Sequence, residues 1–175
     1  MIEIKDLNIS FENEIIFKDF SLSLKKGEKL AVTGESGKGK STLLNLLAGF
    51  IPDYKGNISI FGIELNHITI LEIRKKIAWL PQDTSLNIKT VKELFFAPFE
   101  FHLNKENRPS KKEISEMFKH FDLSENLLQK KVKEISGGQK QRIILASCLL
   151  SEKPLLLADE PTSALDEKIK HKVTD

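Results

Sequence analysis

A glycine-rich loop carries the residue types best suited to holding phosphate. Residues 34–41 read Gly-Glu-Ser-Gly-Lys-Gly-Lys-Ser, which matches G-x-x-x-x-G-K-[ST] between an apolar stretch and a helical one. Glycines let backbone N–H groups curl around phosphate oxygens, Lys40 is spaced to reach the β- and γ-phosphates, and Ser41 to ligate Mg²⁺. The candidate phosphate-binding residues are Gly34, Glu35, Ser36, Gly37, Lys38, Gly39, Lys40, Ser41 and Thr42. Two alternatives are a glycine-rich turn without a ligand and, for Lys38 alone, a solvated lysine.

Two adjacent carboxylates follow an apolar stretch near the C-terminus. Residues 155–158 read Leu-Leu-Leu-Ala and lead directly into Asp159 and Glu160. Neighbouring side chains of an extended chain point to opposite sides, so the two acids can do different work. Asp159 is suited to hold Mg²⁺, directly or through water, and Glu160 to polarise an attacking water as general base. Taken alone, such a pair more commonly caps a neighbouring helix, but in combination with the phosphate loop at Gly34 the metal-binding and base roles are favoured.

A second candidate anion site begins at Ser136. The run Ser136, Gly137, Gly138, Gln139 opens an amphipathic stretch, where the serine hydroxyl can cap a helix and the glycines leave N–H groups open to an anion. The chain already has a phosphate loop. The most economical target for this second site is therefore a nucleotide held by another copy of the chain.

The elements needed to position these residues alternate between strands and helices. We expect strands at residues 2–10, 15–24, 29–33, 57–62, 77–80 and 155–158, and helices at 41–50, in much of 90–134 and after Ser136. Gly49 is the expected stop of the helix at 41–50. Ser110 and Glu113 form a capping-box pattern within the helical stretch. Such alternation predicts an α/β core with a parallel sheet.

Composition narrows the class of protein. Hydrophobic residues make up 40% and charged residues 30% of the 175, and the net charge of +2 is too small to indicate nucleic-acid binding. The single cysteine, Cys148, excludes an intrachain disulfide and lies in an apolar run that predicts a buried thiol. No apolar targeting core precedes the first strand, so we expect a cytoplasmic protein whose membrane role would require a partner.

These segments together resemble the nucleotide-binding domain of the ATP-binding cassette (ABC) superfamily over nearly the whole chain. The Ser136 run matches the family's signature motif, residues 77–82 (Ile-Ala-Trp-Leu-Pro-Gln) look like its Q-loop, and residues 161–166 look like its D-loop. The resemblance implies a P-loop NTPase core with a mostly parallel sheet, an N-terminal antiparallel β-subdomain and an inserted α-helical lobe. We expect the core at residues 1–89 and 136–175 and the lobe at 90–135.

The resemblance also implies roles for individual residues, with ATP and Mg²⁺ as cofactors. Phe11 would stack on adenine, although a strand residue here could also belong to the core. Gln82 would contact Mg²⁺ or the attacking water, and Asp166 would reach the partner's phosphate loop. Two head-to-tail copies would trap two ATP molecules, with Ser136 and Gly138 completing the partner's site.

A membrane-embedded transporter subunit is the implied second partner. Four phenylalanines follow Gln82, where the family borders the groove for that subunit; they could instead form the core of the lobe, and some of them could serve each purpose. They are Phe95, Phe96, Phe99 and Phe101. We expect an ATPase at the inner face of the cell membrane. The alternatives are a soluble, non-transport ABC ATPase and a nucleotide-binding module without turnover.

One element of the family pattern is not found in the sequence. The family has a strand ending in a switch histidine after the D-loop, whereas His171 follows Asp166 too closely and fits a helical surface position. We therefore expect a fragment of a protein about 30–50 residues longer, judged from usual helix and strand lengths. ATP turnover by the 175 residues alone is expected to be weak or absent.

Overall fold

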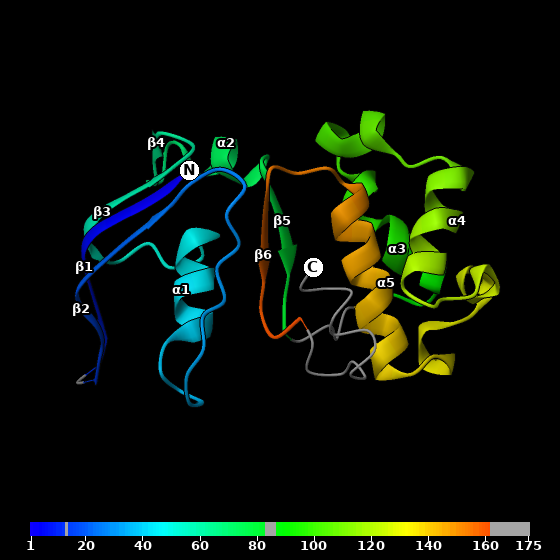
Figure 1. Ribbon diagram of the computed structural model, residues 1–175, viewed down its shortest axis with the longest axis horizontal. Helices are drawn as coiled ribbons and strands as arrows, with labels where there is room; N and C mark the ends of the chain where they lie inside the picture. The colour runs from blue at the N-terminus through cyan, green and yellow to red at the C-terminus, as the bar shows by residue number, and fades with distance from the viewer. Residues whose placement is uncertain (13, 83–86, 162–175) are drawn as a thin grey trace. The chain divides into compact units, whose positions relative to one another are not determined.

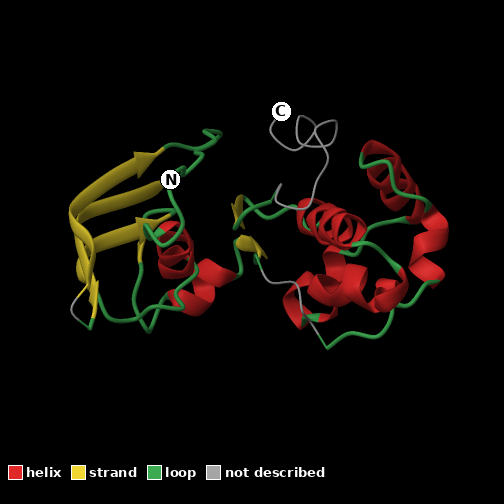
Figure 2. Ribbon diagram, turned by 90° about the horizontal axis from the view of Figure 1, so that it is seen from below, coloured by secondary structure: helices red, strands yellow, loops and turns green. Residues whose placement is uncertain are grey.

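The structure, a computed structural model, describes residues 1–12, 14–82 and 87–161 of the chain. The chain divides into two compact units, an N-terminal unit of residues 1–77 and a C-terminal unit of residues 78–175. Strands dominate the first and helices the second (Figures 1 and 2). In the described ranges, no helix has the length and apolar character needed to cross a bilayer.

The N-terminal unit is built on an antiparallel sheet. Its strands are β1 (Ile2–Phe11), β2 (Glu14–Leu24), β3 (Lys55–Ile60) and β4 (Ile63–Glu64), in the order β2-β1-β3-β4. The alternation that predicted β1 is visible in its burial: Ile2, Ile4 and Ile9 face the core while the residues beside them are exposed or half-buried. The predicted antiparallel β-subdomain is confirmed.

The N-terminal unit also contains two helices. Helix α1 (Lys40–Leu47) buries Leu43, Leu46 and Leu47 and stops at Gly49, whose φ of 72° confirms the predicted glycine stop. Helix α2 (Ile70–Arg74) holds that end of α1. Arg74 donates hydrogen bonds to the carbonyls of Ala48 (2.9 Å) and Gly49 (3.0 Å), so a side chain satisfies two carbonyls at and just after the C-cap of α1.

The strand predicted at residues 29–33 is wrong. These residues are irregular and exposed, and Leu30 and Val32 are among the exposed large hydrophobic side chains. A buried parallel strand depends on ladder hydrogen bonds from its neighbours. None of the described strands pairs with residues 29–33, so they form no strand here.

The C-terminal unit combines a short parallel sheet with a layer of helices. Strand β5 (Ile77–Leu80), whose first residue ends the N-terminal unit, lies beside β6 (Leu155–Ala158) and runs in the same direction (Figure 1). Its helices are α3 (Val91–Glu100), α4 (Lys111–His120) and α5 (Gly137–Leu150), with 3₁₀ turns η1 (His102–Asn107), η2 (Glu125–Gln129) and η3 (Val132–Glu134). The predicted bounds of both strands and the predicted Ser110–Glu113 capping box are confirmed.

Aromatic side chains fill the core of this unit. Phe95 meets Phe118 edge-on at 5.4 Å between ring centroids, and Phe99 is also fully buried. By contrast Phe101 is 69% exposed and Phe96 is half-buried. Of the four phenylalanines for which two roles were open, Phe95 and Phe99 are therefore core residues and Phe101 belongs to the surface.

Cys148 is a buried packing residue, as predicted. Its thiol lies 3.6 Å from the carbonyl of Trp79, and burial raises the pKa of Cys148 to about 12. A thiol with that pKa is protonated at neutral pH, which makes it a poor nucleophile.

Candidate functional site

The phosphate loop of the N-terminal unit gets its shape from glycines. Gly37 and Gly39 adopt φ values of 82° and 85°, in the left-handed region that other residues enter at a cost. Gly39 is the N-cap of α1 and lies close to β2, because a Cβ added to it would meet Ile16 at 2.6 Å and Phe17 at 3.2 Å. Backbone conformation and close packing at Gly39 thus fix where the loop ends and the first turn of α1 begins.

The Lys40 side chain is hydrogen-bonded to the start of the phosphate loop. Its ammonium donates hydrogen bonds to the carbonyl oxygens of Gly34 (2.9 Å) and Glu35 (2.7 Å), which places a positive charge beside the residues predicted to hold phosphate. Ser41 and Thr42 follow in the first turn of α1 and are half-buried. The first turn contains no acidic residue, so the helix dipole and Lys40 both favour an anion here.

Phe11 lies at the end of β1, paired with Glu14 at the start of β2. Its side chain is 46% exposed, so part of its surface is available to a flat ligand. Strand β2 continues from there to Ile16 and Phe17, the residues that contact Gly39. The same two strands therefore carry Phe11 and support the phosphate loop.

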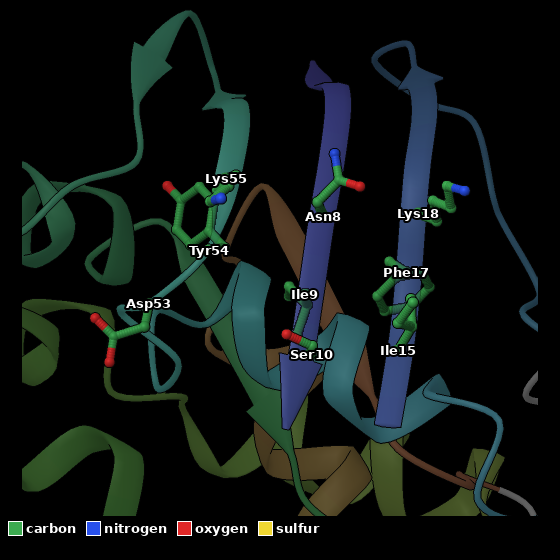
Figure 3. Close-up of a pocket in the computed structure, with 9 residues that line it drawn as sticks. All are labelled: Asn8, Ile9, Ser10, Ile15, Phe17, Lys18, Asp53, Tyr54 and Lys55. Carbon is green, nitrogen blue, oxygen red and sulfur yellow. The ribbon is translucent and has the colours of Figure 1, made fainter. Parts of the chain in front are cut away.

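A cavity of about 550 Å³ opens on the same unit but does not include the predicted site residues. Figure 3 shows its lining on β1, β2 and the segment leading into β3, with Asn8, Phe17, Lys18 and Tyr54 among the residues drawn. The Tyr54 hydroxyl donates to the carbonyl of Leu65 at 2.6 Å. Burial, and then the nearby Glu64 carboxylate, raise the pKa of Tyr54, so it stays a neutral donor.

In the C-terminal unit, the acidic pair and Gln82 follow neighbouring strands. The N–H of Asp159 donates to the carbonyl of Leu80 at 2.9 Å, which joins the ends of β6 and β5. Asp159 is 6% exposed whereas Glu160 is exposed, so the two carboxylates have different surroundings. Gln82 is exposed two residues beyond Leu80. Asp159, Glu160 and Gln82 thus leave the same end of the sheet.

The signature run has the predicted cap. The Gln139 N–H donates to the Ser136 hydroxyl at 3.2 Å, and the Ser136 N–H donates to the Gln139 side-chain oxygen at 3.0 Å. This capping box fixes the start of α5. A Cβ added to Gly137 would meet nothing within 4 Å, so the face of the turn at Gly137 is open to a ligand.

Gln141 is a residue near the site for which the sequence predicted no role. It lies on α5, is buried, and donates from its amide nitrogen to the carbonyl of Glu160 at 2.9 Å. The only signal in the sequence is a polar residue two positions before the apolar run that starts at Ile143. Its hydrogen-bonding partner lies 19 residues away and could not be read from spacing.

The donor set fits a magnesium ion better than a softer metal. Ser41, Gln82 and Asp159 offer hydroxyl, amide and carboxylate oxygens, and Mg²⁺ prefers oxygen ligands while keeping waters and substrate oxygens. No cluster of three or more histidine, cysteine or acidic side chains able to hold a metal occurs among the described residues. The phosphate loop and Phe11 belong to the N-terminal unit, whereas Gln82, Asp159, Glu160 and the run at residues 136–139 belong to the C-terminal unit; Asp166 lies outside the described residues.

Comparison with known proteins decides the family. A family model described as "ABC transporter" matches residues 17–163. The chain belongs to the ABC transporter family. An ergothioneine transport ATP-binding protein of Helicobacter pylori is 36% identical over 168 residues, covering 95% of this chain and 77% of that protein. A thiamine import ATP-binding protein of Histophilus somni is 38% identical over 169 residues, with the same two shares.

Similarity to a solved structure identifies the fold. A dimeric ATP-binding cassette in a post-hydrolysis state with ADP and Pi matches with a TM-score of 0.81 and 30% identity, over 99% of this chain and 79% of that one. The predicted ABC resemblance and P-loop NTPase fold class are therefore confirmed, and the chain is an ATP-binding cassette of the ABC type.

Proposed function

We propose that the protein is the ATP-binding and ATP-hydrolysing subunit of an ABC transporter, which works as a head-to-tail dimer and energises a separate membrane subunit. The observation that carries the proposal is the presence, in one ABC cassette, of a phosphate loop on α1 and a capped signature turn on α5. Two anion-binding turns on one chain are what a composite site between two copies requires.

The phosphate loop would hold the nucleotide. Lys40 would exchange its two carbonyl partners for β- and γ-phosphate oxygens, a stronger charge-assisted interaction. Backbone N–H groups of the glycine-rich turn would hold the remaining oxygens, and Phe11 would stack on the base. Ser41, Gln82 and Asp159 would hold Mg²⁺, which neutralises charge on the phosphates when bound.

Glu160 would act on the water. Its carboxylate would accept a proton from the attacking water, whose oxygen forms the new bond to the γ-phosphorus as the bond to ADP breaks. Burial of Asp159 beside an exposed Glu160 suits a metal ligand next to a base.

The proposal also includes dimerisation and a membrane partner. The solved relative is described as dimeric, and the curated relatives are described as transport and import ATP-binding proteins. In a head-to-tail pair Ser136 and Gly138 would contact the partner's ATP, and Asp166 would reach the partner's phosphate loop. We place the protein in the cytoplasm, at the inner face of the membrane, with no nucleic-acid partner.

The test measures Mg-ATP binding and phosphate release on the same protein. We expect Lys40→Ala to abolish binding, and Glu160→Gln to retain binding, abolish release and accumulate an ATP-bound dimer on gel filtration. Lys92→Ala, an exposed lysine on α3, is the matched control and should leave both unchanged. Absence of ATP binding by the unaltered chain, or phosphate release that survives Glu160→Gln, would contradict the proposal.

A further inference from the structure

Gln141 is one of few buried polar side chains in the described part of the molecule. It is 6% exposed and sits on α5 beside the apolar run that starts at Ile143. Its amide nitrogen donates to the backbone carbonyl of Glu160 at 2.9 Å. The acceptor is the peptide oxygen, so this hydrogen bond does not use a carboxylate oxygen of Glu160.

The backbone at Glu160 has an uncommon conformation. Its φ is 48°, in the left-handed region that residues with a Cβ enter only when their surroundings hold them there. The preceding residue is fixed, because the Asp159 N–H is hydrogen-bonded to Leu80. The next peptide helps to set the backbone that carries the Glu160 side chain, and Gln141 contacts the carbonyl of that peptide.

Helix α5, which carries Gln141, is itself held in place by side-chain hydrogen bonds to neighbouring helices. Arg142 donates to the carbonyl of Phe121 at 3.2 Å, and Ser147 donates to that of Phe95 at 2.6 Å. These bonds fix α5 against the end of α4 and against α3. A buried amide is retained at low cost only when hydrogen-bonded, so packing alone would be served as well by an apolar side chain.

We propose that Gln141 is a positioning residue for hydrolysis: it holds the peptide of Glu160 in the left-handed conformation that aims the carboxylate at the attacking water. This inference rests on the proposed function, with Glu160 as the base. Helix α5 would then have two functions. Ser136 at its start would face the partner's ATP, and Gln141 would position Glu160, the base that acts at the chain's own ATP.

The experiment compares Gln141→Met with Ser147→Ala. Methionine keeps the length of the side chain without the donor, and Ser147→Ala removes another buried hydrogen bond from the same helix to a backbone carbonyl. Single-turnover phosphate release from Mg-ATP and equilibrium ATP affinity are measured for each full-length chain. For Gln141→Met we expect release to slow by about 10- to 100-fold, the scale of a misplaced catalytic group, with ATP affinity changed less than about twofold. Ser147→Ala should leave both within about twofold.

A second readout does not depend on turnover. Amide hydrogen exchange at Asp159 and Glu160 should speed up in Gln141→Met but not in Ser147→Ala. Gln141→Glu, which matches the native shape and places a carboxylate against the carbonyl, should behave like Gln141→Met. Agreement of the two variants would identify the donor, and not side-chain packing, as the cause.

Several results would overturn the inference. One is release unchanged by Gln141→Met; another is release lowered alike by Gln141→Met and Ser147→Ala in proportion to their loss of thermal stability. If the unaltered chain binds ATP but releases no phosphate, hydrolysis as proposed fails for this chain. The hold of Gln141 on the Glu160 peptide is then decided by exchange alone, where faster exchange supports it and unchanged exchange refutes it.

Discussion

The two units hold their predicted site residues in different ways. In the N-terminal unit the phosphate loop is exposed, follows an irregular segment, and owes its shape to glycines with positive φ. In the C-terminal unit the acidic pair follows a buried strand, and the signature turn starts a helix fixed in an aromatic core. The phosphate loop therefore depends mainly on glycine backbone conformation, whereas the signature turn depends on a helix held by side-chain packing.

That difference predicts which substitutions damage the predicted site residues of each unit. A change at a loop glycine should weaken nucleotide binding with modest effect on the C-terminal unit. A change in the aromatic core should unfold the C-terminal unit and remove the acidic pair and signature turn together. The following experiments test this contrast, from the largest expected effect to the smallest.

Phe95→Ala should have the largest effect on stability. The ring is fully buried and meets Phe96 and Phe118 edge-on, so its removal leaves a cavity and should lower the free energy of unfolding by about 3–5 kcal/mol. Urea unfolding followed by Trp79 fluorescence measures the change. Phe101→Ala, at an exposed phenylalanine, is the control and should lie within about 0.5 kcal/mol of the unaltered chain. Equal losses in the two variants would refute the placement of the core.

Gly39→Ala should weaken ATP binding more than Gly37→Ala. Both glycines have left-handed φ, and forcing alanine there costs about 1 kcal/mol at each. Only at Gly39 would the new methyl group also meet Ile16 at 2.6 Å, which forces the loop away from β2. Titration with a fluorescent ATP analogue measures both affinities. The distinction between strain and close packing fails if Gly37→Ala is as damaging as Gly39→Ala.

Ser136→Ala and Ser110→Ala should lower stability equally but differ in function. Each removes the hydroxyl of a capping box at the start of a helix of the C-terminal unit and should lower the free energy of unfolding by about 1 kcal/mol. Only Ser136 is proposed to contact the partner's ATP. Ser136→Ala should therefore also reduce ATP-driven dimerisation, measured by light scattering. If Ser110→Ala reduces dimerisation as much, the effect belongs to helix stability.

The smallest expected effect concerns Cys148 and pH. Burial raises the pKa of this thiol from 9.0 to about 12, so between those values the unfolded chain loses a proton that the folded chain keeps. This contribution to stability is complete below pH 9.0 and decreases as the pH rises toward 12. Urea unfolding at pH 8 and pH 10 should show a decrease that is smaller in Cys148→Ala. An identical pH dependence in the variant would place the thiol in solvent.

Features encoded locally could be predicted from the sequence. The capping boxes at Ser110 and Ser136, the glycine stop at Gly49 and the bounds of β6 each depend on residues within a few positions of one another, and each is confirmed. The strand predicted at residues 29–33 failed for the opposite reason. An apolar run becomes a strand only where neighbouring strands supply hydrogen bonds, and the described strands do not pair with it.

The sequence by itself determined the family and the order of the motifs, because the phosphate loop, Asp159–Glu160 and the signature run are short stretches with their own spacing. Tertiary structure alone decided that Phe95 is core while Phe101 is surface, and that Gln141 holds the carbonyl of Glu160. The physical reason is distance along the chain. Burial and a hydrogen bond across 19 residues exist only after α5 and β6 have packed into one unit.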